Sequence, residues 1–140
     1  MKNVLFGAIV LWSAAVSVRT VMGQAAGAPQ APPLDPQVLA WDRGTDKIDV
    51  SKYPADVKKN YKVFAEICAQ CHPLARAVNC DFALEDDWER YIKRMMRRGR
   101  SLVTPEQAEA AYEFAIYDSK IRKKDLYDRK LKLKQQQGGF

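Results

Sequence analysis

The first regular pattern of apolar side chains lies just before the middle of the chain and predicts an amphipathic helix. Its apolar positions are three or four residues apart: Val57, Tyr61, Phe64 and Cys68. Side chains at this spacing lie on one face of an α-helix, which can be buried against a core. Pro54 stands where such a helix would begin. We expect Pro73 to end it, because proline lacks the backbone N–H that would continue the hydrogen-bond ladder.

Charged residues mark the two ends of a second predicted helix. Acidic residues stand near its start and basic residues near its end: Asp86, Asp87, Arg97, Arg98 and Arg100. This order favours a helix, because the N-terminus carries a partial positive charge and the C-terminus a partial negative one. Gly99 is a suitable stop signal. Trp88 and Met95 are two turns apart and therefore share a face, on which Tyr91 and Ile92 also lie.

A third predicted helix has a strong start signal. Thr104 can cap it, Pro105 suits its first position, and Gln107 can complete a capping box. Small and apolar side chains then recur at helical spacing: Ala108, Ala111, Tyr112, Ala115 and Ser119. Alanines permit a close crossing with another helix. We expect that partner to be the first helix, through Tyr61 and Phe64.

These patterns, with no internal repeat and no convincing strand, predict an all-α fold. We assign residues 47–119 to one compact domain of three to four helices, with residues 73–84 as a connecting loop. Residues 24–46 are rich in Pro, Ala, Gly and Gln and predict an extended linker. Trp41 in this linker docks either on the domain or on a partner. Residues 120–140 form a basic, low-complexity tail that either extends the last helix or is disordered.

Residues 1–23 are typical of a signal peptide. Lys2 supplies a positive start, residues 4–18 are apolar, and cleavage after Gly23 fits a small-residue site. The apolar stretch is short for a membrane span, which needs about 20 residues, so cleavage is favoured. An uncleaved anchor is the alternative. Both predict a domain in the periplasm or another extracytoplasmic compartment, either soluble or membrane-anchored.

The pentapeptide Cys68-Ala69-Gln70-Cys71-His72 carries the candidate chemistry. C-x-x-C-H is the pattern of covalent haem attachment. Two thiols one helical turn apart can each add to a vinyl group of one haem, and the histidine can then ligate the iron. Zinc would need about four ligands, whereas the chain adds only Cys80 and no second histidine. A redox dithiol would favour a βαβ context, and this region reads as helical. We interpret Cys80 as a small buried apolar residue.

The methionines supply a candidate for the opposite side of the iron. Met1 and Met22 lie in the predicted signal peptide, which leaves Met95 and Met96 as the thioethers of the mature protein. His72 is the only histidine, so ligation by two histidines of one chain is impossible. A sixth ligand from this chain is most simply a methionine, and two adjacent ones are available.

With these residues, the chain resembles small monohaem class I c-type cytochromes. Tyr61-x-x-Phe64-x-x-x-Cys68-x-x-Cys71-His72 is similar to their N-terminal helix. Trp88-x6-Met95, followed by Thr104-Pro105-Glu106, is similar to a bacterial subgroup with a Trp-x6-Met helix before the final helix. The resemblance covers about residues 47–119. One departure is that residues 73–84 lack the Gly-Pro-x-Leu element that often supports the histidine in mitochondrial-type members.

The resemblance implies one covalently attached haem c, around which the helices wrap. His72 would be the proximal iron ligand and Met95 the distal one, with Met96 as the alternative because the methionine is doubled. Trp88 is expected to pack on or beside the ring. At most one or two arginines of this region are expected to pair with the haem propionates, and most of them to form a solvated helix face: Arg76, Arg90, Arg94, Arg97 and Arg98.

These features favour an electron-transfer protein rather than an enzyme. Two strong protein ligands leave no open position for a substrate, and methionine ligation raises the reduction potential. The alternatives are a cytochrome subunit fixed in a membrane respiratory or photosynthetic complex, and a haem peroxidase or gas sensor with an open sixth position. The chain carries a net charge of +6, and the tail alone accounts for as much. Acidic-faced redox partners or an anionic membrane are therefore expected, or else the tail only aids solubility. The export signal disfavours nucleic-acid binding.

Overall fold

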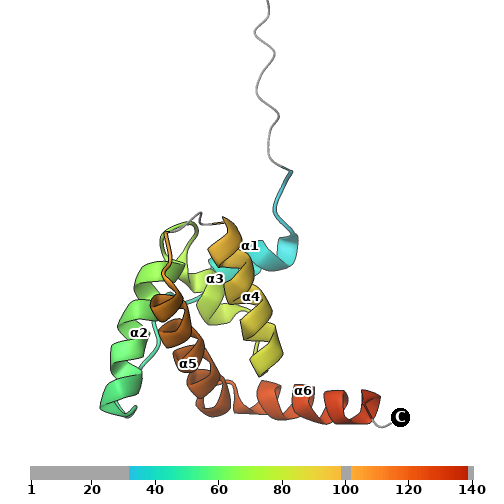
Figure 1. The fold of residues 1–140 in the computed structure, drawn as a ribbon. Helices are drawn as coiled ribbons and strands as arrows, with labels where there is room; N and C mark the ends of the chain where they lie inside the picture. The colour runs from blue at the N-terminus through green and yellow to red at the C-terminus, as the bar shows by residue number, and fades with distance from the viewer. Residues whose placement is uncertain (1–31, 99–101, 139–140) are drawn as a thin grey trace, which may run out of the picture. The chain divides into compact units, whose positions relative to one another are not determined.

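The computed structural model describes residues 32–98 and 102–138 of the chain. All regular secondary structure in these ranges is α-helical, which confirms the predicted all-α class. The helices are α1 (Pro36–Asp42), α2 (Ala55–Cys68), α3 (Leu74–Asn79), α4 (Glu85–Arg98), α5 (Pro105–Ile121) and α6 (Lys124–Gln137) (Figure 1). The signal peptide predicted at 1–23 and the predicted linker up to residue 31 lie outside the described residues, as does Gly99.

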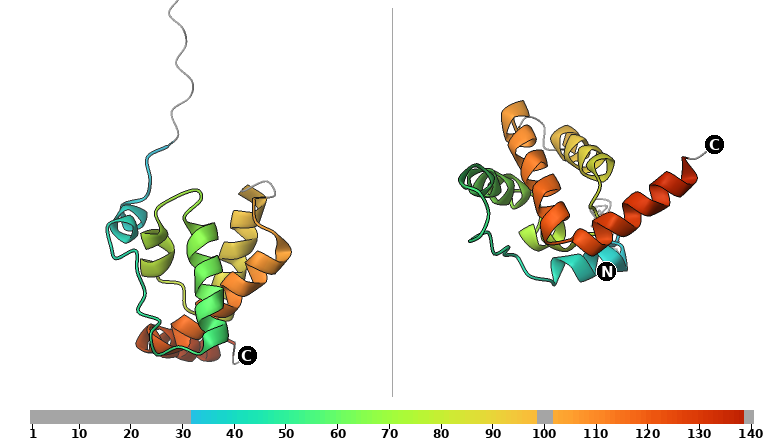
Figure 2. Two further views of the ribbon diagram at one scale, coloured as in Figure 1. Left: turned by 90° about the vertical axis from the view of Figure 1, so that its left-hand side faces the viewer. Right: turned by 90° about the horizontal axis from the view of Figure 1, so that it is seen from below.

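The core is built on the crossing of α2 and α5, which lie side by side in Figures 1 and 2. The small side chains predicted to line this crossing are buried: Ala108, Ala111, Ala115 and Ser119. Phe114, which the pattern analysis did not single out, is the aromatic centre. Its ring centroid lies 5.0 Å from those of both Tyr61 and Phe64. The predicted partnership of the two helices is therefore confirmed.

The charged turns predicted for α4 and the predicted start of α5 are also confirmed. Acidic residues fill the first turn of α4, and Arg97 and Arg98 lie in its last turn. At the start of α5 the capping box is formed in both directions. The Gln107 backbone N–H donates to Thr104 Oγ1 at 3.2 Å, and the Thr104 backbone N–H donates to Gln107 Oε1 at 3.0 Å. The start of α5 is therefore set by local hydrogen bonds, and that of α4 is favoured by the helix dipole.

α2 ends earlier than predicted. It stops at Cys68, and Cys71 and His72 lie in the turn that follows, rather than in a helix running up to Pro73. Pro73 is instead the N-cap of α3. Because a proline disfavours helical backbone in the residue before it, His72 cannot continue α2, and the chain turns before α3 begins.

Two short helices arise where the sequence predicted a loop and a linker. α3 occupies the first half of the predicted loop 73–84, and its alanine-rich stretch is buried through Ala75, Ala77 and Val78. α1 occupies part of the predicted linker 24–46 and packs against α3. Both corrections have the same reason. Helices of six or seven residues gain little from propensity and are stabilised by tertiary contacts.

The predicted basic tail contains a helix of its own, α6, which neither extends α5 nor is disordered. The chain turns sharply after α5, and α6 passes below the start of α4 (Figures 1 and 2). Lysines of this segment pair with the acidic first turn of α4: Lys120 with Glu85, Lys130 with Asp87 and Lys134 with Asp86, at 2.9, 2.9 and 3.3 Å. Part of the tail's positive charge is therefore neutralised within the domain.

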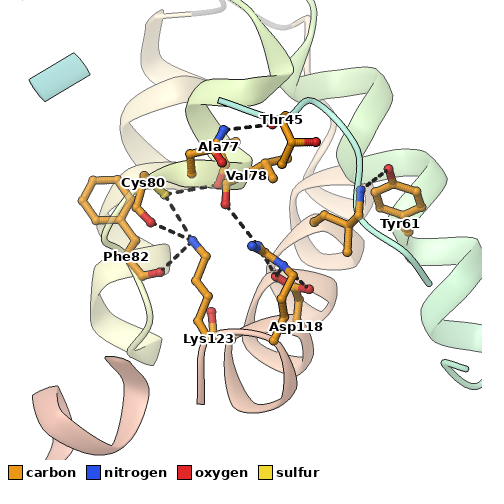
Figure 3. Close-up of polar contacts among 12 residues, drawn as sticks. Thr45, Tyr61, Ala77, Val78, Cys80, Phe82, Asp118 and Lys123 are labelled. Carbon is orange, nitrogen blue, oxygen red and sulfur yellow. Dashed lines mark hydrogen bonds and ion pairs between the residues drawn. The ribbon is translucent and has the colours of Figure 1, made fainter. Parts of the chain in front are cut away.

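The sharp turn between α5 and α6 caps α3 and the residues after it (Figure 3). The Lys123 ammonium donates to the backbone oxygens of Cys80 and Phe82, at 2.7 and 3.3 Å. Arg122 donates to the Val78 oxygen at 3.1 Å and forms an ion pair with buried Asp118. These cations satisfy carbonyl groups that the short helix leaves without partners.

Candidate functional site

A cavity of about 410 Å³ opens between α1, the end of α2, and α4. The residues of the C-x-x-C-H motif and both methionines contribute to its lining: Cys68, Cys71, His72, Met95 and Met96. The motif comes from the turn after α2 and the methionines from the last turns of α4. The fold therefore brings together the thiols, imidazole and thioethers that the sequence singled out. Most of the remaining lining is apolar, with Ile67, Phe82 and Ile92 among it.

The His72 imidazole is held by hydrogen bonds on both nitrogens. Nδ1 lies 3.1 Å from the Pro73 carbonyl oxygen, and Nε2 lies 3.1 Å from the Tyr91 hydroxyl. A carbonyl can only accept, so this arrangement assigns the proton to Nδ1. Nε2 then carries the lone pair and accepts from the tyrosine. This is the tautomer in which Nε2 can ligate a metal while Nδ1 is oriented by a backbone oxygen.

The two motif thiols differ in exposure. Cys71 is exposed, whereas burial raises the pKa of the Cys68 thiol to about 12. Cys80 lines the same cavity. Cys80 is 3% exposed, which confirms the prediction that it is buried. Its thiol donates to the Ala77 backbone oxygen at 3.2 Å. Burial also raises the pKa of this third thiol. Only Cys68 and Cys71 have the spacing that two vinyl groups of one haem require.

Met95 and Met96 are both half-buried at the cavity. Met95 also packs against the hydrophobic core. Since adjacent helical residues point about 100° apart, only one of the two sulfurs can face a given point at a time. The structure brings both to the cavity, so the choice between them remains a prediction.

Trp88 was expected to pack on or beside a haem ring, and the structure places its side chain in the hydrophobic core. It is 2% exposed and is not among the residues that line the cavity. Its indole Nε1 donates to Ser119 Oγ at 2.9 Å, and its ring stands edge-on to Phe64 and Phe82. The aromatic side chains at the cavity are instead Trp41, Phe82 and Tyr91. Tyr91 could have been found from the sequence, since it lies four residues before Met95 on the same helical face.

Of the five arginines considered, three line the cavity, and Arg90 and Arg97 do not. Arg76, Arg94 and Arg98 line the cavity. Arg90 instead pairs with Asp86 and Asp87 on the surface of α4, at 3.0 Å to each. Arg76 is bound to Asp42, whereas the Arg94 guanidinium lies over the Tyr91 ring, 5.6 Å from its centroid. The basic lining can balance negative charge on a bound group.

The donor set fits a haem c. Such a group takes two thiols, one imidazole and one further donor from the chain, and all of these border one largely apolar cavity. One contact must change, because iron at Nε2 of His72 would take the position that the Tyr91 hydroxyl holds. Within residues 32–98 and 102–138, no group of three or more His, Cys, Asp or Glu side chains is arranged to hold a metal ion. None of the described helices is long and apolar enough to cross a membrane.

No protein-family model, curated protein or solved structure matches this chain.

Proposed function

We propose that this chain is a monohaem c-type cytochrome that carries single electrons between redox-partner proteins outside the cytoplasm. One haem c would be attached through Cys68 and Cys71. His72 would be the proximal ligand and Met95 the distal ligand, with Met96 as the alternative. The observation that carries the proposal is the meeting of the C-x-x-C-H motif with these methionines at one cavity.

The chain's own residues would divide the work. The Pro73 oxygen orients the imidazole through Nδ1 and keeps the lone pair on Nε2. Apolar side chains such as Ile67 and Phe82 keep water from the cavity, and Arg94 and Arg98 bring positive charge to it. The bound haem would supply one-electron chemistry, with a potential that thioether ligation raises. A single site of this kind needs no substrate-binding position, so we propose a carrier and no enzyme.

Mass spectrometry under denaturing conditions tests the attachment. The full chain, produced in a bacterium that has c-type haem attachment machinery, is expected to gain the mass of one haem. Replacing Cys68 and Cys71 with alanine is expected to abolish this gain. Cys80→Ala is the matched control, because that thiol lines the same cavity but lacks the motif spacing. A wild-type chain without haem, or a double variant that still binds it covalently, would overturn the proposal.

The proposed partners are redox proteins with acidic faces. Although Lys120, Lys130 and Lys134 form ion pairs within the domain, α6 still presents exposed cations: Lys124, Arg129, Lys132 and Lys134. Association with an acidic partner should weaken as salt is added. At physiological ionic strength, attraction between exposed charges is largely screened beyond about 8–10 Å, and added salt shortens this distance. A fixed subunit of a membrane complex is the alternative. Recovery of the chain in a stable complex after mild extraction would favour it.

A further inference from the structure

One wall of the cavity comes from the segment before the predicted domain. Leu34, Val38 and Trp41 line the cavity from this segment. Val38 and Trp41 lie on one side of α1, and Leu34 precedes the helix. Leu39 lies on the same helix but does not line the cavity, and it is 41% exposed. We call residues 34–45 the N-terminal wall. Asp35 caps the start of its helix α1, because its side chain accepts a hydrogen bond from the Gln37 backbone N–H at 2.7 Å.

A two-pronged ion pair fastens the end of α1 to α3. Arg76 donates through Nε to Asp42 Oδ1 at 2.8 Å and through a terminal nitrogen to Oδ2 at 2.6 Å. Both side chains are mostly buried, at 19% and 15% exposed. The hydrogen bonds from Arg76 hold the pKa of Asp42 below its usual value. Because this geometry is bidentate and partly desolvated, it fixes direction as well as distance.

A second fastening lies one turn further along α3. The Asn79 amide nitrogen lies within hydrogen-bonding distance of the carbonyl oxygens of Trp41, Thr45 and Ala75, at 3.1, 2.8 and 2.7 Å. It therefore joins the end of the wall to α3 itself. Gly44 permits this approach. A β-carbon added there would overlap the Asn79 amide, which these carbonyls hold in place.

We propose that Arg76 and Asn79 are positioning residues that hold the N-terminal wall against the cavity, and that the wall limits the access of small molecules to the group bound there. Trp41 is the central contact, because it lines the cavity and packs edge-on to Phe82 with centroids 6.0 Å apart. The docking of the wall follows from the contacts alone. Its effect on access rests on the proposed haem.

Amide hydrogen exchange on the full-length chain tests the docking. Peptides that cover residues 34–45 are expected to be protected in the wild type. Asp42→Asn keeps the side-chain shape but removes the ion pair, and Gly44→Ala displaces the Asn79 amide. Each is expected to speed exchange in these peptides about tenfold, while peptides from α5 are unchanged. Leu39→Ala is the matched control and should leave the wall protected. Wild-type exchange at the rate of an unstructured peptide would overturn the inference.

Binding of imidazole to the oxidised haem-loaded protein tests the effect on access. The rate of binding is expected to rise about tenfold in Asp42→Asn and Gly44→Ala, in proportion to exchange, and to stay at the wild-type value in Leu39→Ala. A change in exchange without any change in imidazole binding would reject the access role. If the wild-type chain takes up no haem, both the proposed function and the access role fail. Hydrogen exchange still decides whether the wall is docked.

Discussion

The hydroxyl of Tyr91 lies 3.1 Å from Nε2 of His72, the nitrogen through which this histidine would ligate iron. The lone pair on Nε2 can bind either the tyrosine hydroxyl or a metal ion, but not both at once. The Pro73 carbonyl sets the tautomer, and the tyrosine, which occupies the ligating nitrogen, must give way before a metal can bind. The same hydrogen bond holds the imidazole in place and blocks the nitrogen that would bind iron.

Removing the hydroxyl with Tyr91→Phe separates these two effects. We expect haem content at least equal to that of the wild type, because the ligating nitrogen is freed and Pro73 still orients the ring. Stability without haem should fall by about 1 kcal/mol for the lost hydrogen bond. Haem per chain and denaturant unfolding measure the two. Tyr112→Phe is the control. A clear loss of haem in Tyr91→Phe would show that the hydroxyl is needed for attachment.

Separate replacements of Met95 and Met96 identify the distal ligand. We expect Met95→Ala to lose the weak long-wavelength absorption band of ferric iron bound to methionine sulfur and to lower the reduction potential. Met96→Ala should keep both. The opposite pattern would leave the function intact and shift the ligand by one residue. If the wild type lacks the band and binds carbon monoxide readily, a peroxidase or gas sensor becomes the better reading.

Trp88 is expected to act on stability rather than on the haem. Trp88→Phe leaves the buried Ser119 hydroxyl without its indole partner and should lower the free energy of unfolding by about 1–3 kcal/mol. In the Ser119→Ala background the same change should cost less, because the interaction is already absent. Denaturant unfolding of the four proteins gives the coupling. A large shift of the haem spectrum in Trp88→Phe would instead support the original expectation that the indole packs on the ring.

The attachment of α6 to α4 should be lost in acid. Burial opposes ionisation of Asp87, but hydrogen bonds from Lys130 and from two backbone N–H groups outweigh it and lower its pKa. A carboxyl with a lowered folded-state pKa stabilises the fold above its unfolded value of about 3.9, and this contribution is lost as the pH falls below that value.

Thermal unfolding as a function of pH measures this contribution. The melting temperature of the wild type should fall as the pH is lowered from about 5 to about 3. Asp87→Asn should melt at a lower temperature near neutral pH and change less over this interval. Asp128→Asn, which removes the exposed ion pair with Lys124, is the control and should follow the wild type. Parallel curves for wild type and Asp87→Asn would contradict the assignment.

The sequence predicted the elements whose signals are local. The apolar stripe of α2, the charged ends of α4 and the Thr104–Gln107 capping box each lie within a few residues, and all three helices are present. α1 and α3 were missed, because their stability depends on contacts between distant residues, such as Asp42 with Arg76. A run of prolines and alanines says nothing of such a contact.

The candidate site shows the same division. The covalent spacing of C-x-x-C-H is a local requirement, so Cys68, Cys71 and His72 could be named from sequence. The position of Trp88 could not, since a tryptophan two turns from a methionine suits both a core and a cavity wall. The Trp88 side chain lies in the core because its indole N–H donates a hydrogen bond to Ser119, which is 31 positions away in the sequence.

The capping of α3 by Lys123 has a consequence for the order in which the protein is made. Lys123 follows Cys80 by 43 positions, and its ammonium group binds the backbone oxygens of Cys80 and Phe82. In a chain made from the N-terminus, the C-x-x-C-H motif is therefore synthesised before Lys123. If haem is attached as we propose, the thiols would become available for attachment while one side of the cavity is still incomplete. We therefore expect haem to be attached faster to a chain that lacks its C-terminal segment than to the complete folded chain, because that segment closes one side of the cavity.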